Sequence, residues 1–99
     1  MAYDDKEQAA ILEMFGEMLQ QATVDGGAKR KAGLKPPWWC DKSHAAASRR
    51  HGARWELGEV ADKDSGAHPL IHRAWRDLAI AYQETYGMVD PREAGLISG

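Results

Sequence analysis

The sequence predicts a small all-α domain, and three observations support that prediction. Apolar residues recur at helical spacing in long segments, glycine and proline interrupt the chain between them, and no stretch alternates in the manner of a strand. The 99 residues are expected to form one domain, because a second would have too few residues to bury a core. We expect three helices, two of them paired as a hairpin, with oligomerisation completing a bundle.

The first predicted helix covers residues 4–23. Glu13 and Glu17 fall opposite its apolar side and are expected to be solvated. Gly26 and Gly27 are predicted to end it, because glycine favours the conformation that terminates a helix. The apolar side, with the spacing of one helical face, consists of Ile11, Leu12, Phe15, Met18, Leu19 and Ala22.

Residues 24–42 are predicted to form a connector. Pro36 and Pro37 exclude a helix at their position and favour extended backbone. Two adjacent tryptophans, Trp38 and Trp39, follow at once. Such a pair in a loop usually caps a core or fills an interface, and the alternative is stacking on a nucleobase, which needs a flat apolar face.

The second predicted helix covers residues 43–57, with Asp41 or Ser43 as its N-cap. Its alanines favour helix and allow a neighbouring helix to approach closely. One stripe is too polar for a pure core and too apolar for a solvent face. That stripe consists of His44, Ala47, Ser48, His51 and Trp55.

The third predicted helix covers residues 68–86. Pro69 suits its first turn and Gly87 suits its end. Asp64 and Ser65 are predicted as its N-caps, because short oxygen-bearing side chains bond the free N–H groups of a first turn. The face expected to be buried consists of Leu70, Ile71, Ala74, Trp75, Leu78, Ala81 and Tyr82.

Composition limits the location and partners of the protein. The net charge is −5 over residues 1–25, +7 over 26–55 and −4 over 56–99. This pattern suits internal salt bridges, pairing between copies of the protein or a local phosphate site, and it argues against general nucleic-acid binding. No apolar run approaches the roughly 20 residues of a membrane span, and the acidic N-terminus is unlike a secretory signal, so we expect a cytoplasmic protein without membrane contact. The single Cys40 excludes an intramolecular disulfide, and the tail, 88–99, is expected to fray or to dock on a partner.

Polar side chains suited to chemistry concentrate around the turn between the second and third predicted helices. A helical hairpin would bring His51 close to the start of the third helix. Glu59 and Asp62 in the turn are candidate ligands for Mg²⁺ or Mn²⁺, because these ions prefer carboxylates. A metal held there would polarise a phosphoryl oxygen, while Arg50 or Arg54 would hold phosphate charge.

The same residues also have simpler interpretations. Glu59 and Asp62 suit a turn or a helix cap, and His51 suits the edge of a core. His72 flanks the apolar side of its helix, although its i, i+4 spacing from His68 would also allow chelation of zinc or nickel. No serine or cysteine has a recognisable activating base, and no glycine-rich phosphate loop is present in the sequence.

Several spaced polar positions between residues 49 and 80 agree with one family pattern at once. They are Arg50 with His51, Gly58 with Glu59, Asp62, Ser65 with Gly66, and His72. Looser agreement upstream involves Gly27, Ala28, Lys29 and the loop tryptophans, so the likeness covers residues 26–85. In these features the chain resembles the phage protein family called dATP/dGTP diphosphohydrolase, N-terminal. It departs from the family at Pro69, where members often have a histidine.

The resemblance implies hydrolysis of purine deoxynucleoside triphosphates to monophosphate and pyrophosphate, in phage nucleotide metabolism. That chemistry is similar to the chemistry of MazG-like all-α pyrophosphohydrolases, which use Mg²⁺ on clustered acidic residues and assemble as oligomers. Under the resemblance, Glu59 and Asp62 would hold Mg²⁺ or Mn²⁺, and His51 and His72 would act on phosphate or water. The substrate would be bound by Arg50, Arg54, Trp38 and Trp39.

A different class of function is a non-catalytic phage protein that binds and modulates a host protein. Small size, segregated charge and two adjacent loop tryptophans favour it. A structural or nucleic-acid-associated role for the basic middle segment is the third hypothesis. Under each of them a homo-oligomer is expected, because three helices in so short a chain bury little surface.

Overall fold

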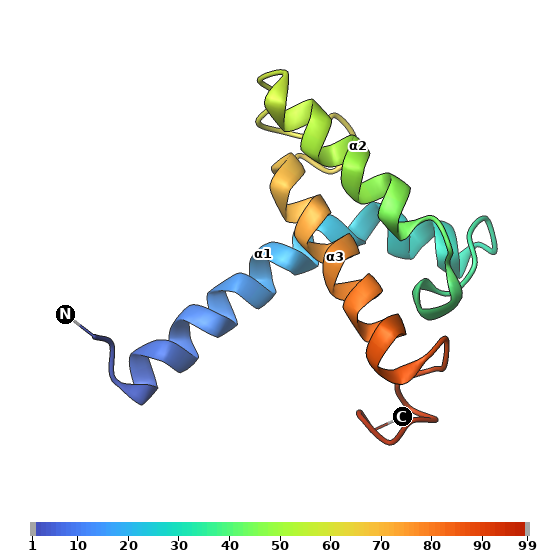
Figure 1. Ribbon diagram of the computed structural model, residues 1–99. Coiled ribbons are helices and arrows are strands. Elements are labelled where there is room, and N and C mark those ends of the chain that lie inside the picture. Colours follow the sequence, from blue (N-terminus) through green and yellow to red (C-terminus); the bar gives the residue numbers. More distant parts are fainter. Residues whose placement is uncertain (1, 99) are drawn as a thin grey trace.

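The computed structural model describes residues 2–98, and these residues form three α-helices and no strand (Figure 1). The helices are α1 (Asp5–Lys31), α2 (His44–Glu56) and α3 (Pro69–Tyr86), and a short 3-10 turn, η1 (Trp38–Cys40), precedes α2. The all-α prediction is therefore confirmed. Helix α3 is central, since it packs along α2, crosses α1 and touches η1. None of the helices in the described part of the chain is long and apolar enough to cross a membrane.

Helix α1 is longer than the sequence predicts. It runs through Gly26 and Gly27, so the prediction that these glycines end it near residue 23 is wrong. The end comes at Gly33, which has a φ of +76°, and the N–H groups of Gly33 and Leu34 bond to carbonyls of the last turn at 3.0 and 2.9 Å. Three basic residues in that turn favour the extension, because they complement the negative end of the helix dipole.

The apolar side of α1 is largely exposed in the single chain. Figure 1 shows the N-terminal half of α1 extending away from the other helices, so little packs against it. Leu12 is 67% exposed and Phe15 is 48% exposed, whereas Ala22, nearer the crossing with α3, is buried. The predicted face therefore exists, but one chain covers only its C-terminal end. Asp4 and Glu7 start the helix with a reciprocal capping box.

Helices α2 and α3 begin and end within one residue of the predicted bounds, but their N-termini are capped differently. Ser43 occupies the N-cap position of α2 without making a capping hydrogen bond. Asp41 instead accepts the N–H and hydroxyl of Ser43 at 2.9 and 2.6 Å. At α3 the cap is His68, whose Nδ1 accepts the N–H two residues further on at 3.0 Å, so the predicted caps Asp64 and Ser65 are wrong.

The face that α3 turns to α2 is largely polar, and none of the seven residues predicted to be buried on α3 is among its buried residues. His72 stacks on an α2 histidine, Arg76 donates to His44 at 2.9 Å, and Asp77 accepts from the Ser48 hydroxyl at 2.6 Å. The predicted apolar side, which includes Leu78 at 57% exposure, faces α1 and open grooves instead. The polar stripe predicted on α2 is the reason, since it needs polar partners across the helix interface.

The N-terminal half of the α2 stripe is buried, as its mixed character suggests. Ala47 is fully buried and Gly52 is buried, and these small residues allow the two helices to approach closely. A Cβ at Gly52 would lie 2.5 Å from Nη1 of Arg73, so the α3 arginine occupies the space that a side chain would fill. Trp55, at the far end of the stripe, is 45% exposed.

One buried carboxylate joins the loop to two helices. The Asp41 side chain is only 6% exposed, and its Oδ2 lies 3.1 Å from Arg30 of α1 and 3.7 Å from Arg76 of α3. Burial by itself raises the pKa of Asp41, but hydrogen bonds from Ser43 and Arg30 outweigh that effect and lower the pKa to about 2. The side-chain amide of Gln83 also links α3 to this loop, because it donates a hydrogen bond to the carbonyl of Asp41 at 2.9 Å.

The Asp41→Asn substitution is expected to destabilise the protein by about 2–4 kcal/mol at pH 7, since it leaves two buried guanidinium groups without their counter-charge. The folded-state pKa lies below the ordinary value of 3.8, so this contribution is present above pH 4 and is lost as the pH falls towards 2. Urea unfolding followed by circular dichroism between pH 7 and pH 2 measures the difference.

Asp25→Asn is the matched control. Its ion pair with Lys29 is equally short, 3.1 Å, but both side chains are more than 40% exposed, so the loss is expected to stay below about 1 kcal/mol. Equal stability of the two variants would contradict the role assigned to Asp41.

Candidate functional site

A basic pocket of about 280 Å³ lies where the C-terminal half of α1, the following loop, α2, the turn after α2 and α3 meet. Six cationic side chains and three carboxylates line it, together with two histidines and a serine. The cations are Lys29, Arg30, Lys35, Arg50, Arg54 and Arg76; the carboxylates are Asp25, Asp62 and Asp64; the others are His51, His72 and Ser65. The pocket therefore carries an excess of positive charge.

Part of this charge is already compensated. Arg30 and Arg76 pair with Asp41, which lies behind the pocket wall, and Arg54 lies 3.7 Å from Asp62. Arg50 makes no ion pair within residues 2–98. The pocket therefore presents cationic groups that an entering anion would neutralise.

The environment of Lys35 reports the positive field of the pocket. Burial lowers the pKa of its ammonium group, and the positive charges of Arg76, Lys29 and Arg30 lower that pKa further. Asp41 opposes the shift with a smaller effect. An anion bound among these groups would relieve their mutual repulsion.

Two stacked histidines form one wall of the pocket. The rings of His51 and His72 are nearly parallel, with centroids 4.8 Å apart, as the predicted hairpin requires. Nε2 of His72 lies 2.6 Å from the hydroxyl of Ser65, which fixes the orientation of that ring. Nδ1 of His51 is buried and has no hydrogen-bond partner among the described residues, which is unusual for a buried polar atom.

Both imidazoles resist protonation. Burial lowers the pKa of His51, and the neighbouring charges of His72, Arg54 and Arg76 bring it to about 4. Burial also lowers the pKa of His72, with Asp62 opposing the effect and Arg76 adding to it. At neutral pH the pair is therefore uncharged, and a bound anion would favour its protonated form.

Asp62 shapes the turn between α2 and α3. Its Oδ1 accepts the N–H groups of Asp64 and Ser65 at 2.9 and 3.1 Å. Burial alone would raise the pKa of Asp62, but these backbone hydrogen bonds lower it, so the group is a carboxylate at neutral pH. This turn places the Ser65 hydroxyl beside His72 and thereby orients the histidine pair.

Glu59 does not line the basic pocket. It lines a surface depression with Arg54, Leu57, Gly58 and Lys63, and Arg54 is shared with the basic pocket, which Asp62 lines. Within residues 2–98 no group of three or more histidine, cysteine or acidic side chains is disposed to hold a metal ion. Metal binding by Glu59 and Asp62 together stays a prediction.

The loop tryptophans lie outside the basic pocket. Trp38 packs edge to face against Trp39, Trp75 and Tyr82, with ring centroids 5.7, 6.4 and 4.9 Å away. Trp38 also lines a neighbouring apolar groove, while Trp39 does not. Both tryptophans are half-buried, and only Trp38 combines this aromatic packing with a place in the groove.

The structure brings together five of the predicted site residues and separates the others. Arg50, Arg54, His51, His72 and Asp62 line one pocket, whereas Glu59, Trp38 and Trp39 do not line it. Four cations of the pocket, Lys29, Arg30, Lys35 and Arg76, were not predicted as site residues, although Lys29 is part of the resemblance. Sequence reasoning also found no base for any serine, although Ser65 lies beside His72. The run of basic residues at the C-terminal end of α1 was a usable signal, but the helix was predicted to end before this run, so its side chains were not assigned to a helix face.

Comparison of the chain with models of protein families, with curated proteins and with solved structures gave no match.

Proposed function

We propose that the protein binds the phosphate chain of a purine deoxynucleoside triphosphate in the basic pocket. The observation that carries the proposal is the convergence of six cationic side chains on one small concave site, against three carboxylates. Two of those carboxylates, Asp25 and Asp62, are already paired with Lys29 and Arg54. An anion with several negative charges is the ligand that such a site favours.

The type of side chain supports phosphate as that anion. Guanidinium groups present fixed forks of N–H donors that match phosphate oxygens, and four of the six cations are arginines. Each neutral imidazole already carries one N–H donor, so it can donate a hydrogen bond to phosphate without first binding a proton. The volume of about 280 Å³ suits a chain of phosphate groups.

The resemblance supports the nucleotide as the source of the phosphates. Six of the positions on which it rests line this one pocket; five belong to the hairpin segment 50–72 and the sixth lies on α1. They are Lys29, Arg50, His51, Asp62, Ser65 and His72. A shared pattern of this kind, gathered at one site, is what a common ligand would require.

Mg²⁺ or Mn²⁺ is included in the proposal as an ion that accompanies the phosphates. Mg²⁺ in nucleotide sites is usually held by one or two carboxylates together with substrate oxygens, and a protein-built cage is not needed. Asp62, ionised and fixed by the turn, is the carboxylate of the pocket best suited to that role. The ion would polarise a phosphoryl oxygen when bound.

The Arg50→Gln substitution is expected to weaken binding of dATP and of inorganic tripolyphosphate on the order of ten- to hundredfold, because a charge-assisted hydrogen bond is lost. Arg49→Gln is the matched control, since Arg49 is its neighbour on α2, is exposed and does not line the pocket. Isothermal titration calorimetry at constant ionic strength compares the variants. Equal losses from both substitutions would show a general charge effect and contradict the assigned pocket.

Hydrolysis is tested separately from binding. The reaction that the resemblance implies is attack of water on the triphosphate, cleavage of the bond between the α- and β-phosphates, and release of pyrophosphate. We expect pyrophosphate release from dATP and dGTP with Mg²⁺ or Mn²⁺, and its loss in the Glu59→Ala/Asp62→Ala variant with the helical circular dichroism spectrum retained. Turnover that survives this double substitution would eliminate both carboxylates as metal ligands.

A second candidate function is the binding of another protein, with the modulation of a host protein as the hypothesis from the sequence. The exposed apolar side of α1 favours it, because Leu12, Phe15 and Met18 lie side by side on a helix that extends from the body. The same surface suits a second copy of the chain, which is the homo-oligomer that the sequence predicts.

Light scattering of the purified chain is expected to show a dimer or larger assembly that the Phe15→Glu substitution shifts to monomer. The physical reason is that a buried charge would oppose association of the apolar side of α1. Leu57→Glu is the control, since Leu57 is 88% exposed but lies at the end of α2. A monodisperse monomer of the unsubstituted chain at high concentration would rule out self-association.

A further inference from the structure

We infer that the apolar groove beside the basic pocket is the subsite for the nucleobase, so that the ligand is a nucleotide held at both ends. This inference rests on the proposed function and adds to it a site for the aromatic part of the ligand. The occupant is the planar heteroaromatic base of a nucleoside polyphosphate.

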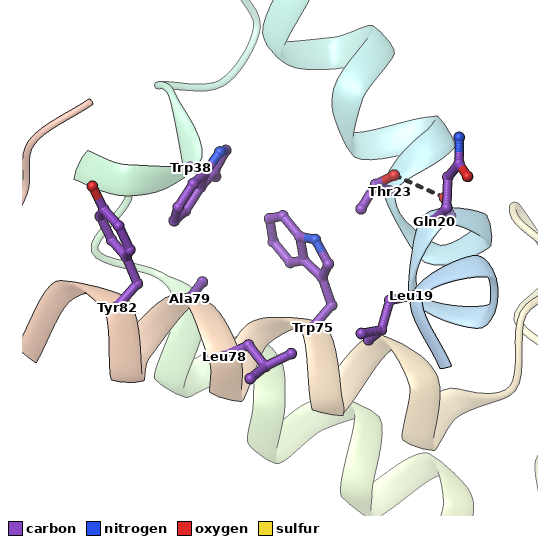
Figure 2. Close-up of a pocket in the computed structure, with 9 residues that line it drawn as sticks. Leu19, Gln20, Thr23, Trp38, Trp75, Leu78, Ala79 and Tyr82 are labelled. Atoms are coloured by element: carbon purple, nitrogen blue, oxygen red, sulfur yellow. Dashed lines mark hydrogen bonds between the residues drawn. The ribbon is translucent and has the colours of Figure 1, made fainter. Parts of the chain in front are cut away.

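The groove lies between α1 and α3 and has a volume of about 570 Å³ (Figure 2). Figure 2 shows Trp38, Trp75 and Tyr82 extending into it from η1 and α3, opposite Leu19 and Thr23 of α1. Three aromatic rings within one groove supply the flat apolar surfaces on which a base stacks. No charged side chain is part of its lining within residues 2–98.

The groove adjoins the basic pocket. Thr23 and Trp75 line both cavities, so the two are direct neighbours. The guanidinium groups of Arg30 and Arg76, which line the basic pocket, lie 5.2 and 5.6 Å from the centre of the Trp75 ring. A ligand whose phosphates lie among the arginines therefore has an aromatic surface beside it. In a nucleotide the phosphates and the aromatic base are likewise the two ends of one molecule.

Charge separates the nucleotide from other occupants of an apolar groove. A free apolar molecule or an apolar peptide would make no use of the adjoining cations, and inorganic polyphosphate would make no use of the rings. A nucleoside polyphosphate satisfies both cavities at once. The polar groups in the lining of the groove, Gln20 and Thr23, are few, which suits stacking as the main interaction.

Gly16 offers a way to fill the groove without disturbing the fold. It lies in α1, lines the groove, and a Cβ built on it meets no atom within 4 Å. Leucine is also a better helix former than glycine. Gly27→Leu is the matched control, because Gly27 is in the same helix, is equally free of contacts, and lines neither cavity.

Isothermal titration calorimetry with dATP and with inorganic tripolyphosphate tests the inference. The unsubstituted protein is expected to bind dATP on the order of ten- to hundredfold more tightly than tripolyphosphate, the difference being the contribution of the stacked base. Gly16→Leu is expected to remove that advantage and to leave tripolyphosphate binding unchanged. Gly16→Ala should give a smaller loss, and Gly27→Leu no loss.

The outcomes distinguish the two proposals. Tripolyphosphate binding without any advantage for dATP would overturn the base subsite and leave the phosphate site standing. Binding of neither ligand would overturn the proposed function and the subsite with it. Full dATP affinity in a folded Gly16→Leu protein would place the base elsewhere. If Gly16→Leu does not fold, which circular dichroism shows, Gly16→Ala decides: a loss of dATP affinity without a loss of tripolyphosphate affinity supports the subsite, and unchanged dATP affinity overturns it.

Discussion

The buried Asp41 carboxylate is the constraint on which the arrangement of the other elements depends. The chain is short and its helices bury few apolar side chains, so the packing of α1 against the other helices relies on ion pairs and hydrogen bonds. Asp41 holds Arg30 of α1 and Arg76 of α3 and also organises the start of α2 through Ser43. Such a cluster is stabilising only when all its members are present, because each isolated charge would be buried without a partner.

The same cluster connects the fold to the candidate site. Arg30 and Arg76 are held from behind by Asp41, while their other sides line the basic pocket and lie close to the ring of Trp75. Their positions are therefore fixed before any ligand arrives, which reduces the entropy lost on binding. Burial that keeps His51 and His72 uncharged adds groups that respond to an entering anion. The stability of the core and the electrostatics of the pocket thus have a common origin.

Much of the fold was predictable from the sequence, because helix periodicity and local stop signals are properties of neighbouring residues. Pro69 and Gly87 marked α3 correctly. Gly26 and Gly27 were wrongly predicted to end α1, because glycine permits a helix-ending conformation without requiring it, and the helix continues through both residues to Lys31. The polar face of α3 was missed for a related reason: a hydrophobicity pattern assigns the apolar side to the core, whereas the polar stripe of α2 required polar partners.

Prediction of the site was likewise reliable only for features that neighbouring residues determine. The hairpin between α2 and α3 is local, so His51, His72, Arg50 and Asp62 were correctly expected near one another. The contribution of α1 depends on a long-range crossing that no local pattern encodes. Lys29 and the other cations of that segment could therefore be read only as a charged run, and the pairing of Glu59 with Asp62 rested on spacing alone.

Nuclear magnetic resonance of the histidine side chains, titrated with and without dATP, tests the central claim most directly. Two of the four histidines, His51 and His72, line the basic pocket, whereas His68 lines neither the basic pocket nor the apolar groove and is the internal control. If the phosphate chain binds there, the pKa of His51 and of His72 will rise when dATP is present, because a nearby anion favours the protonated imidazole. The side-chain signals of His68 are expected to stay unchanged on addition of dATP. Identical titration curves for His51 and His72 with and without dATP would contradict binding at this pocket.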